Sequence, residues 1–218
     1  MLSVYVCRKE RVLAMLEEMR QFAREAWIPV ILDDSLEYVK TLLSSLKPFR
    51  ILEIGTAIGY SSAIFSEYLE DGGSVDTIEI DKQRIMLARA NHKMLKLEDK
   101  IHIIEGDALE VLPKLRERYD FIFIDGPKSH YIEYLPYCKR LLSEKGVMLA
   151  DNVIYKGMVT GPEFVKHKQR TAVMRLREFI DTVQKDEELQ SELLDIGDGL
   201  LVMRKKQDTM NCVRTEEK

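Results

Sequence analysis

The stretch Arg50-Ile-Leu-Glu-Ile-Gly-Thr-Ala-Ile-Gly-Tyr-Ser-Ser62 decides the fold of this chain. It starts as a short apolar run that contains one carboxylate, Glu53, and it continues through two glycines into a helical segment. Glycine lets a backbone turn sharply and approach a ligand closely, and the N–H groups that open a helix bind polar ligands. The spacing of Gly55 and Gly59 differs from the G-x-G-x-x-G pattern of dinucleotide-binding proteins, which disfavours a nicotinamide cofactor. We therefore expect a strand, a ligand-binding turn and a helix, with a tight turn that binds nothing as the alternative.

Composition and length favour one cytoplasmic domain. The chain has 218 residues, 45% of them hydrophobic, which is enough for one core of ordinary size. We expect a single domain over 1–206, with two leading helices in 1–47 and a Rossmann-like core in 50–206, and a frayed polar tail in 207–218. No apolar run is long enough to span a membrane, and the start lacks the order of a secretion signal. The cysteines are too far apart for a zinc site, and their use fits a reducing compartment: Cys7, Cys138 and Cys212.

Strand and helix patterns alternate along most of the chain. Helices are expected at 8–26 and 33–46, the second with Asp33, Asp34 and Ser35 as candidate caps. Strands are then expected at 50–54, 74–80, 101–105, 120–124 and 146–150, separated by helices at 60–69, 82–96, 109–118 and 131–142. Strands connected by long helices form parallel sheets. After a helix at 171–185, two runs at 189–196 and 200–204 flank Gly197-Asp-Gly199 and indicate a hairpin. The fold class is therefore α/β, a doubly wound, mostly parallel sheet of seven strands with a C-terminal antiparallel hairpin.

Each expected parallel strand ends in or near a carboxylate. The five are Glu53, Glu79, Asp107, Asp125 and Asp151. In an open α/β sheet these strand ends line the edge at which ligands bind. A helix cap is the alternative for any one of them, and Asp107 is the best candidate for that role. A binding site explains all five together better than five separate caps do.

The acids divide into two groups by their order in the chain. Glu79 follows the second strand and is positioned to accept hydrogen bonds from ribose hydroxyls, which suits an adenosine-bearing cofactor. Asp125, Asp151 and Asn152 supply only oxygen ligands, which is the ligand chemistry that Mg²⁺ prefers. Lys128 lies three residues after Asp125, and a nearby metal and a cationic cofactor would lower its pKa and suit it to act as a general base.

Five ordered motifs carry a family resemblance. They are Leu52-Glu-Ile-Gly-Thr-Ala-Ile-Gly-Tyr-Ser61, Thr77-Ile-Glu79, Glu105-Gly-Asp-Ala108, Phe123-Ile-Asp-Gly-Pro-Lys128 and Ala150-Asp-Asn-Val153. The chain resembles the cation-dependent, catechol-type O-methyltransferases that use S-adenosylmethionine, over roughly 28–204. Within that family it looks closest to the bacterial branch that includes tRNA 5-hydroxyuridine methyltransferase. The resemblance implies the class I methyltransferase fold, S-adenosylmethionine and Mg²⁺ or another divalent cation as cofactors, and a homodimer.

The resemblance also implies residue roles. The cofactor-binding residues would be Ile31, Glu53, Gly55, Ser61, Glu79, Asp107, Ala108 and Asp125. The metal ligands would be Asp125, Asp151 and Asn152, with Lys128 and Asp125 as the catalytic residues. The chain departs from the family at Gly126-Pro127, where relatives commonly carry two small residues other than proline. Proline stiffens the loop that holds Lys128.

Of three candidate functions we expect the first, and the other two are its alternatives. The first is methylation of 5-hydroxyuridine at the wobble position of the tRNA anticodon loop. Although the net charge is −4, a basic stretch follows the expected metal ligands and could bind phosphate: Lys156, Lys166, Lys168, Arg170, Arg175 and Arg177. The second is methylation of small catechol or caffeoyl-type phenols, and the third is nucleotide or RNA binding without catalysis. Intact Asp125, Lys128, Asp151 and Asn152 disfavour the third.

Overall fold

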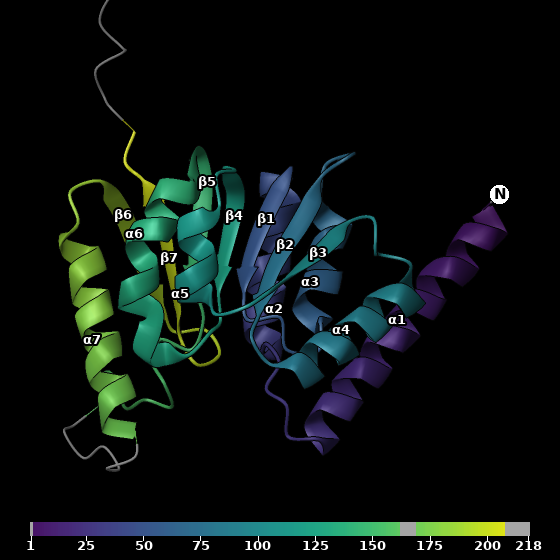
Figure 1. Cartoon of the computed structure of the whole chain (residues 1–218), viewed down its shortest axis with the longest axis horizontal. Helices are drawn as coiled ribbons and strands as arrows, with labels where there is room; N and C mark the ends of the chain where they lie inside the picture. Colours follow the sequence, from purple (N-terminus) through teal and green to yellow (C-terminus); the bar gives the residue numbers. More distant parts are fainter. Residues whose placement is uncertain (1, 162–168, 208–218) are drawn as a thin grey trace, which may run out of the picture.

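One seven-stranded sheet forms the centre of the molecule in a computed structural model that describes residues 2–161 and 169–207 (Figure 1). Its strands are β1 (Arg50–Ile54), β2 (Ser74–Glu79), β3 (Ile101–Glu105), β4 (Tyr119–Ile124), β5 (Leu142–Ala150), β6 (Leu189–Leu194) and β7 (Leu200–Lys205). They lie in the order β3-β2-β1-β4-β5-β7-β6. Strands β1 to β5 run parallel, and β7 runs antiparallel to both of its neighbours. The predicted doubly wound sheet with a closing hairpin is confirmed.

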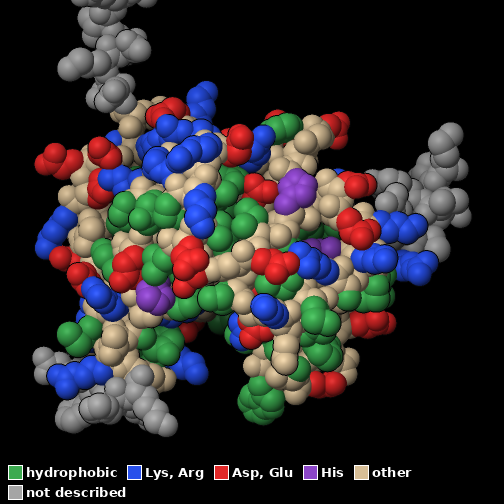
Figure 2. All heavy atoms as spheres, viewed as in Figure 1, with side chains coloured by type: hydrophobic (Ala, Val, Ile, Leu, Met, Phe, Trp, Pro, Cys, Tyr) green, Lys and Arg blue, Asp and Glu red, His purple; other side chains and the backbone are tan. Residues whose placement is uncertain are grey.

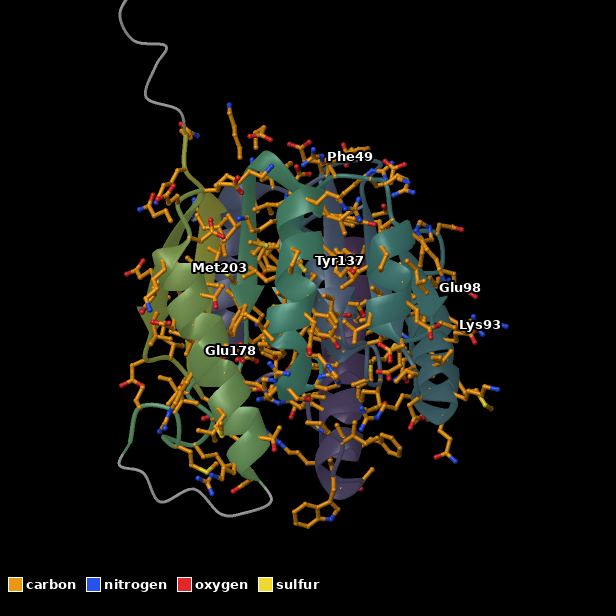
Figure 3. The ribbon with its side chains drawn as sticks, turned by 60° about the vertical axis from the view of Figure 1, so that its left-hand side comes forward. Phe49, Lys93, Glu98, Tyr137, Glu178 and Met203 are labelled. Carbon is orange, nitrogen blue, oxygen red and sulfur yellow. The ribbon has the colours of Figure 1, made fainter. Side chains whose placement is uncertain are left out.

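Helices cover both faces of this sheet, as parallel strands require. They are α1 (Leu2–Glu25), α2 (Asp33–Leu46), α3 (Tyr60–Phe65), α4 (Lys82–Leu95), α5 (Ala108–Val111), α6 (Tyr131–Leu141) and α7 (Arg170–Lys185), with short 3₁₀ turns η1 (Ser66–Tyr68), η2 (Leu112–Lys114) and η3 (Lys128–His130). One hydrophobic core joins the sheet to α5, α6 and α7, and the other joins it to α1, α2, α3 and the end of α4. Figure 3 shows α6 and α7, labelled at Tyr137 and Glu178, lying side by side.

The residues of β4 show how the sequence pattern builds these two cores. Ile122 and Ile124 face the α5–α7 core, whereas Phe121 and Phe123 face the other one. Side chains of successive strand residues point to opposite faces, so a continuous apolar run fits a strand that is covered on both sides. Phe65 of α3 packs edge-on against both phenylalanine rings, with centroids 5.9 and 5.2 Å away.

The strand register brings the five carboxyl ends to one edge, at the lower side of Figure 1. Ile54 pairs with Ile78 on one side and with Ile124 on the other, and Ile124 pairs with Ala150. The strands therefore end nearly level, and the residues that follow them are neighbours in space.

One expected helix boundary and one expected helix cap were wrong. The helix predicted for 109–118 is α-helical only to Val111 and continues as η2 to Lys114, because Pro113 has no backbone N–H to extend an α-helix. Helix α2 has no side-chain cap, and its N-cap is Leu32. Asp33 and Asp34 instead lie in its first turn, where their charge interacts favourably with the helix dipole.

Two further expectations concern the chain as a whole. Among the described helices, none is long and apolar enough to cross a membrane. The tail predicted to be frayed falls almost entirely on 208–218, outside the described residues, and the division into leading helices and core stays a prediction.

Candidate active site

Glu53 is the centre of a buried hydrogen-bond chain beneath the glycine loop. The parallel register sets it beside Thr77 of β2, and it accepts hydrogen bonds from Thr77 Oγ1 and Ser61 Oγ, both at 2.5 Å. The Thr56 and Thr77 hydroxyls lie 2.6 Å apart and extend the chain. Burial raises the pKa of Glu53 to about 8, against the opposing effect of the hydrogen bonds from Ser61 and Thr77. The first strand and the glycine loop are thus joined through one carboxyl group.

The two loop glycines are required by close approaches. Gly55 has φ +105°, and a Cβ there would lie 2.5 Å from the Asp125 carbonyl oxygen. Gly59 has φ +77°, and its Cβ would lie 2.3 Å from His92 Nε2. Other residues rarely adopt such φ values, so both positions favour glycine. His92 is buried and bonds to Ser62 Oγ and the Gly59 carbonyl, so it fixes the loop from the side of α4.

Glu79 is locked against the same loop. Its Oε2 accepts from the Ala57 N–H at 2.9 Å, and its Oε1 accepts from the N–H groups of Ile80 and Asp81 at 3.0 Å each. Glu79 is only 6% exposed, and together these contacts fix the orientation of its carboxylate beside the turn. Glu79 is thus a rigid acceptor at the end of β2, and its expected ribose contact stays a prediction.

The remaining predicted cofactor residues lie on neighbouring elements. Asp107 accepts from the Leu109 N–H at 2.9 Å and caps α5, so the helix-cap interpretation is confirmed for it. Ala108 opens α5 and is nearly buried. Ile31 is buried in the same core as Ile58 of the glycine loop.

A second cluster forms where β4 and β5 end. Lys128 Nζ donates to Asp125 Oδ1 at 2.7 Å and to the Tyr131 hydroxyl at 2.9 Å. The Tyr131 hydroxyl donates in turn to the Asp151 carbonyl oxygen at 3.0 Å. Asp151 itself is fully buried. The structure therefore brings together Asp125, Lys128 and Asp151, three of the four residues predicted for the chemical step, and Asn152 directly follows the last of them.

The carboxyls and the amine in this cluster shift one another's proton affinity. Burial raises the pKa of Asp151 to about 7, and the nearby Asp125 carboxylate adds to the effect. Burial by itself lowers the pKa of Lys128, but its contacts with Tyr131 and Asp125 outweigh burial and raise that pKa above its ordinary value. The lowered pKa expected for Lys128 applies to a site that holds a metal and a cationic cofactor, so it stays a prediction.

One atom in this cluster fits a cation. Asp151 Oδ1 accepts from the Asn152 N–H at 2.7 Å and lies 3.5 Å from the buried Ser35 hydroxyl. Asp151 Oδ2 is buried and has no hydrogen-bond partner within the described chain. A buried carboxylate oxygen without a partner is costly unless a cation or donor satisfies it. Within those same residues no three His, Cys, Asp or Glu side chains converge, so a metal site here would rely on two carboxylates and the Asn152 amide.

The segment after Asp151 is held in place by hydrogen bonds to the turn between β6 and β7. Asn152, Tyr155 and Lys156 all have positive φ, near +50° to +57° in each case, which is uncommon for residues other than glycine. Gly199 and Asp198 of the β6–β7 turn accept from the Val153 and Ile154 N–H groups at 3.0 and 2.9 Å. The Asp198 carboxylate also accepts from the Lys156 N–H. These contacts hold the residues that follow the expected metal ligands.

Two cations of the expected basic stretch already have partners within the chain. Arg177 donates to the carbonyl oxygens of Val159 and Met158, each at 3.0 Å. Arg175 pairs with Glu178 at 2.9 Å.

The structure describes two of the other cations of the stretch. Lys156 and Arg170 are exposed, and Lys166 and Lys168 lie outside the described residues. Figure 2 shows Lys and Arg side chains beside the undescribed segment at its lower left.

A groove of about 710 Å³ lies elsewhere, between α1, α2 and the end of α4. Leu16, Arg20 and Lys40 contribute to its walls, together with Tyr60, which follows the glycine loop. None of the predicted site residues lines it. We assign the candidate site to the strand edge because the fixed acceptors and the unpartnered carboxylate oxygen are there.

Sequence reasoning missed three supporting residues. Thr77 lies two residues before Glu79, on the same face of β2, so strand periodicity was its signal. Tyr131 lies three residues after Lys128, which places both on one side of a helical turn. Ser35 was interpreted as a cap, and no feature of the sequence indicated its contact with the distant Asp151.

Comparisons with known proteins identify the family of this chain. The family model described as O-methyltransferase matches residues 5–206. The O-methyltransferase ankF of Aspergillus thermomutatus is 32% identical over 180 residues, covering 77% of this chain and 75% of that protein. The caffeoyl-CoA O-methyltransferase of Stellaria longipes is 28% identical over 175 residues, covering 75% and 71%. The solved O-methyltransferase of Bacillus cereus in complex with SAH superposes with a TM-score of 0.78 at 26% identity, covering 88% of this chain and 91% of that one.

Proposed function

This chain belongs to the O-methyltransferase family, and on that premise we propose that it transfers a methyl group from S-adenosylmethionine to the 5-hydroxyl of 5-hydroxyuridine in tRNA, with the help of a divalent cation. The candidate site has two halves: the cofactor half-site is the glycine loop with Glu53 and Glu79, and the metal half-site is the cluster of Asp125, Lys128, Asp151 and Asn152. The observation that carries the proposal is the close contact between these two half-sites. Gly55 of the cofactor loop approaches the backbone of Asp125 so closely that no Cβ fits between them. A cofactor held at Glu79 would then lie next to the cluster of Asp125, Lys128 and Asp151.

The cofactor half of the proposal rests on fixed acceptors. Glu79 would accept hydrogen bonds from the ribose hydroxyls, and Glu53 and Ser61 would lie near the methionine part. The solved Bacillus cereus relative is in complex with SAH, the product that S-adenosylmethionine becomes on giving up its methyl group, which supports this half.

The metal half rests on the unpartnered Asp151 Oδ2. Asp125, Asp151 and Asn152 would hold Mg²⁺ or a similar cation, which when bound lowers the pKa of a hydroxyl and orients it. Lys128 would place an ammonium N–H beside the substrate oxygen as that oxygen becomes an anion. In the transfer itself, the substrate oxygen bonds to the methyl carbon, the carbon–sulfur bond breaks, and the hydroxyl proton leaves to solvent or to a nearby base.

The chemistry of 5-hydroxyuridine suits such a site. Its 5-hydroxyl and 4-carbonyl oxygens are on adjacent ring atoms, like the two oxygens of a catechol. A base in the anticodon loop is unpaired, so it enters a pocket at little cost. Two exposed cations support phosphate binding at the mouth of the site: Lys156, which follows Asn152 closely, and Arg170, at the start of α7.

Small catechol or caffeoyl-type phenols are the second candidate substrates. The name of the Stellaria longipes relative favours them, and so does the internal use of Arg175 and Arg177, which leaves fewer cations for RNA.

Labelled methyl transfer decides between the two substrate classes. We expect incorporation into tRNA that carries 5-hydroxyuridine, at a higher kcat/KM than into caffeoyl-CoA or catechol. Lys156→Glu with Arg170→Glu should weaken tRNA use and reduce its salt dependence, since fewer phosphates are neutralised. The control is Lys145→Glu, an exposed lysine within β5. Methylation of phenols but not of the tRNA would contradict the proposed substrate and favour the second candidate.

A further inference from the structure

Tyr131 links two residues of the candidate site, Lys128 and Asp151, through its hydroxyl. Its side chain is fully buried, its ring packs edge-on against Phe179 of α7 with centroids 5.6 Å apart, and its hydroxyl lies between Lys128 and Asp151. The ring is therefore held by a helix that contributes none of the chemical groups. A phenol fixed in this way has a defined position between the ends of β4 and β5.

The direction of each hydrogen bond follows from the chemistry of the groups. An ammonium only donates, so the Tyr131 oxygen accepts from Lys128 Nζ at 2.9 Å. A carbonyl only accepts, so the single phenol proton points to the Asp151 carbonyl oxygen, 3.0 Å away. The Tyr131 hydroxyl therefore accepts one hydrogen bond and donates one, with Lys128 and Asp151 in the positions that the structure gives them.

The third donor of Lys128 is what this arrangement leaves free. Lys128 Nζ has three N–H donors, of which Asp125 and Tyr131 take two. We propose that Tyr131 is a positioning residue that fixes the Lys128 ammonium, so that one N–H is presented to the substrate oxygen. The effect on turnover rests on the proposed function, whereas the effect on Lys128 itself does not.

Tyr131→Phe removes the hydroxyl and keeps the ring. We expect kcat to fall about tenfold with S-adenosylmethionine affinity unchanged, as for loss of an outer-shell partner of a catalytic group. In Lys128→Ala, which we expect to lower kcat by about 10² to 10⁴, the added Tyr131→Phe should lower kcat no further. Additive effects of the two changes would overturn the proposal. The matched control is Tyr134→Phe, because Tyr134 is a second buried tyrosine on α6 and makes neither of the two hydrogen bonds of the Tyr131 hydroxyl.

A second measurement does not depend on turnover. Reductive methylation with formaldehyde, followed by peptide mass spectrometry, reports how freely each lysine amine reacts. Lys128 should react faster in Tyr131→Phe than in the parent and in Tyr134→Phe, with exposed Lys145 unchanged as the internal standard. Equal Lys128 reactivity in all three proteins would overturn the proposal. If the parent methylates neither substrate class while Lys128 reactivity still rises, the proposed function fails and the positioning role of Tyr131 stands.

Discussion

At the scale of single residues, the candidate site contains buried carboxyl groups whose charge its hydrogen bonds do not fully stabilise. Glu53 has two hydroxyl donors, yet burial raises its pKa to about 8, while Asp151 Oδ2 has no partner in the described part of the chain. Buried carboxylates of this kind are costly in the charged form. The protein keeps them at the strand ends, where a cationic cofactor and a divalent ion would bind under the proposed function.

The Glu53 shift makes a prediction for stability. A carboxyl whose pKa is higher in the folded state binds its proton more tightly when folded, so it stabilises below the unfolded value near 4.5 and this contribution is lost as pH rises through about 8. Glu53→Gln keeps the shape and cannot ionise. We expect the difference in free energy of unfolding, variant minus parent, to grow by about 2 to 4 kcal/mol between pH 5 and pH 8.5.

Urea unfolding of the cofactor-free protein measures this difference. Glu67→Gln, at an exposed position of η1, is the control and should follow the parent at every pH. Parallel pH profiles for the parent and Glu53→Gln would contradict a raised pKa at Glu53.

Most of the residues in the two half-sites were predictable from the sequence, because each acid follows a recognisable strand. The ion pair between Lys128 and Asp125 was not predicted, because the sequence does not show that the lysine side chain turns back to a residue three positions before it. The contact of Ser35 with Asp151 was equally hidden, because it joins positions 116 residues apart.

At the scale of elements, the hairpin of β6 and β7 does more than extend the sheet. Its turn accepts hydrogen bonds from three backbone N–H groups of the segment 153–156, which follows Asn152. Positive φ values cost free energy in residues other than glycine, so contacts from outside the segment are needed to maintain them. The sequence predicted the hairpin but not these hydrogen bonds. The β6–β7 turn meets the segment 153–156 because β7 packs beside β5, and a local sequence pattern does not show that pairing.

Asp198→Ala tests these hydrogen bonds. The variant loses the carboxylate that accepts from Lys156 N–H, which should destabilise the protein by about 1 kcal/mol. Because the segment 153–156 directly follows Asn152, we also expect the Mg²⁺ concentration for half-maximal turnover to rise about tenfold. Asp198→Asn retains an acceptor oxygen and should behave nearly as the parent.

Asp195→Ala, an exposed neighbour just before the turn, is the control for charge. If it shifts the Mg²⁺ dependence as much as Asp198→Ala, the effect is one of charge alone and the role of the hydrogen bond is refuted.

At the scale of the whole molecule, alternation of strands and helices was sufficient to predict the sheet, its parallel core and its closing hairpin. Boundaries failed where local backbone chemistry intervened, as at Pro113. The family resemblance also implies a homodimer, and an anticodon-loop partner is expected from the proposed substrate; both stay predictions. They depend on surfaces, which periodicity does not describe.

The central claim is that two half-sites at one sheet edge carry out cation-dependent methyl transfer. The most direct measurement is transfer of labelled methyl from S-adenosylmethionine to 5-hydroxyuridine tRNA and to catechol, in excess chelator and then with Mg²⁺ added back, for the parent and Asp151→Asn. We expect turnover of the accepted substrate by the parent to fall to background in chelator and to return with Mg²⁺, and Asp151→Asn to stay near background, because a neutral amide binds the cation weakly. Full turnover by the parent in chelator, or by Asp151→Asn at the parent's Mg²⁺ concentration, would contradict the account.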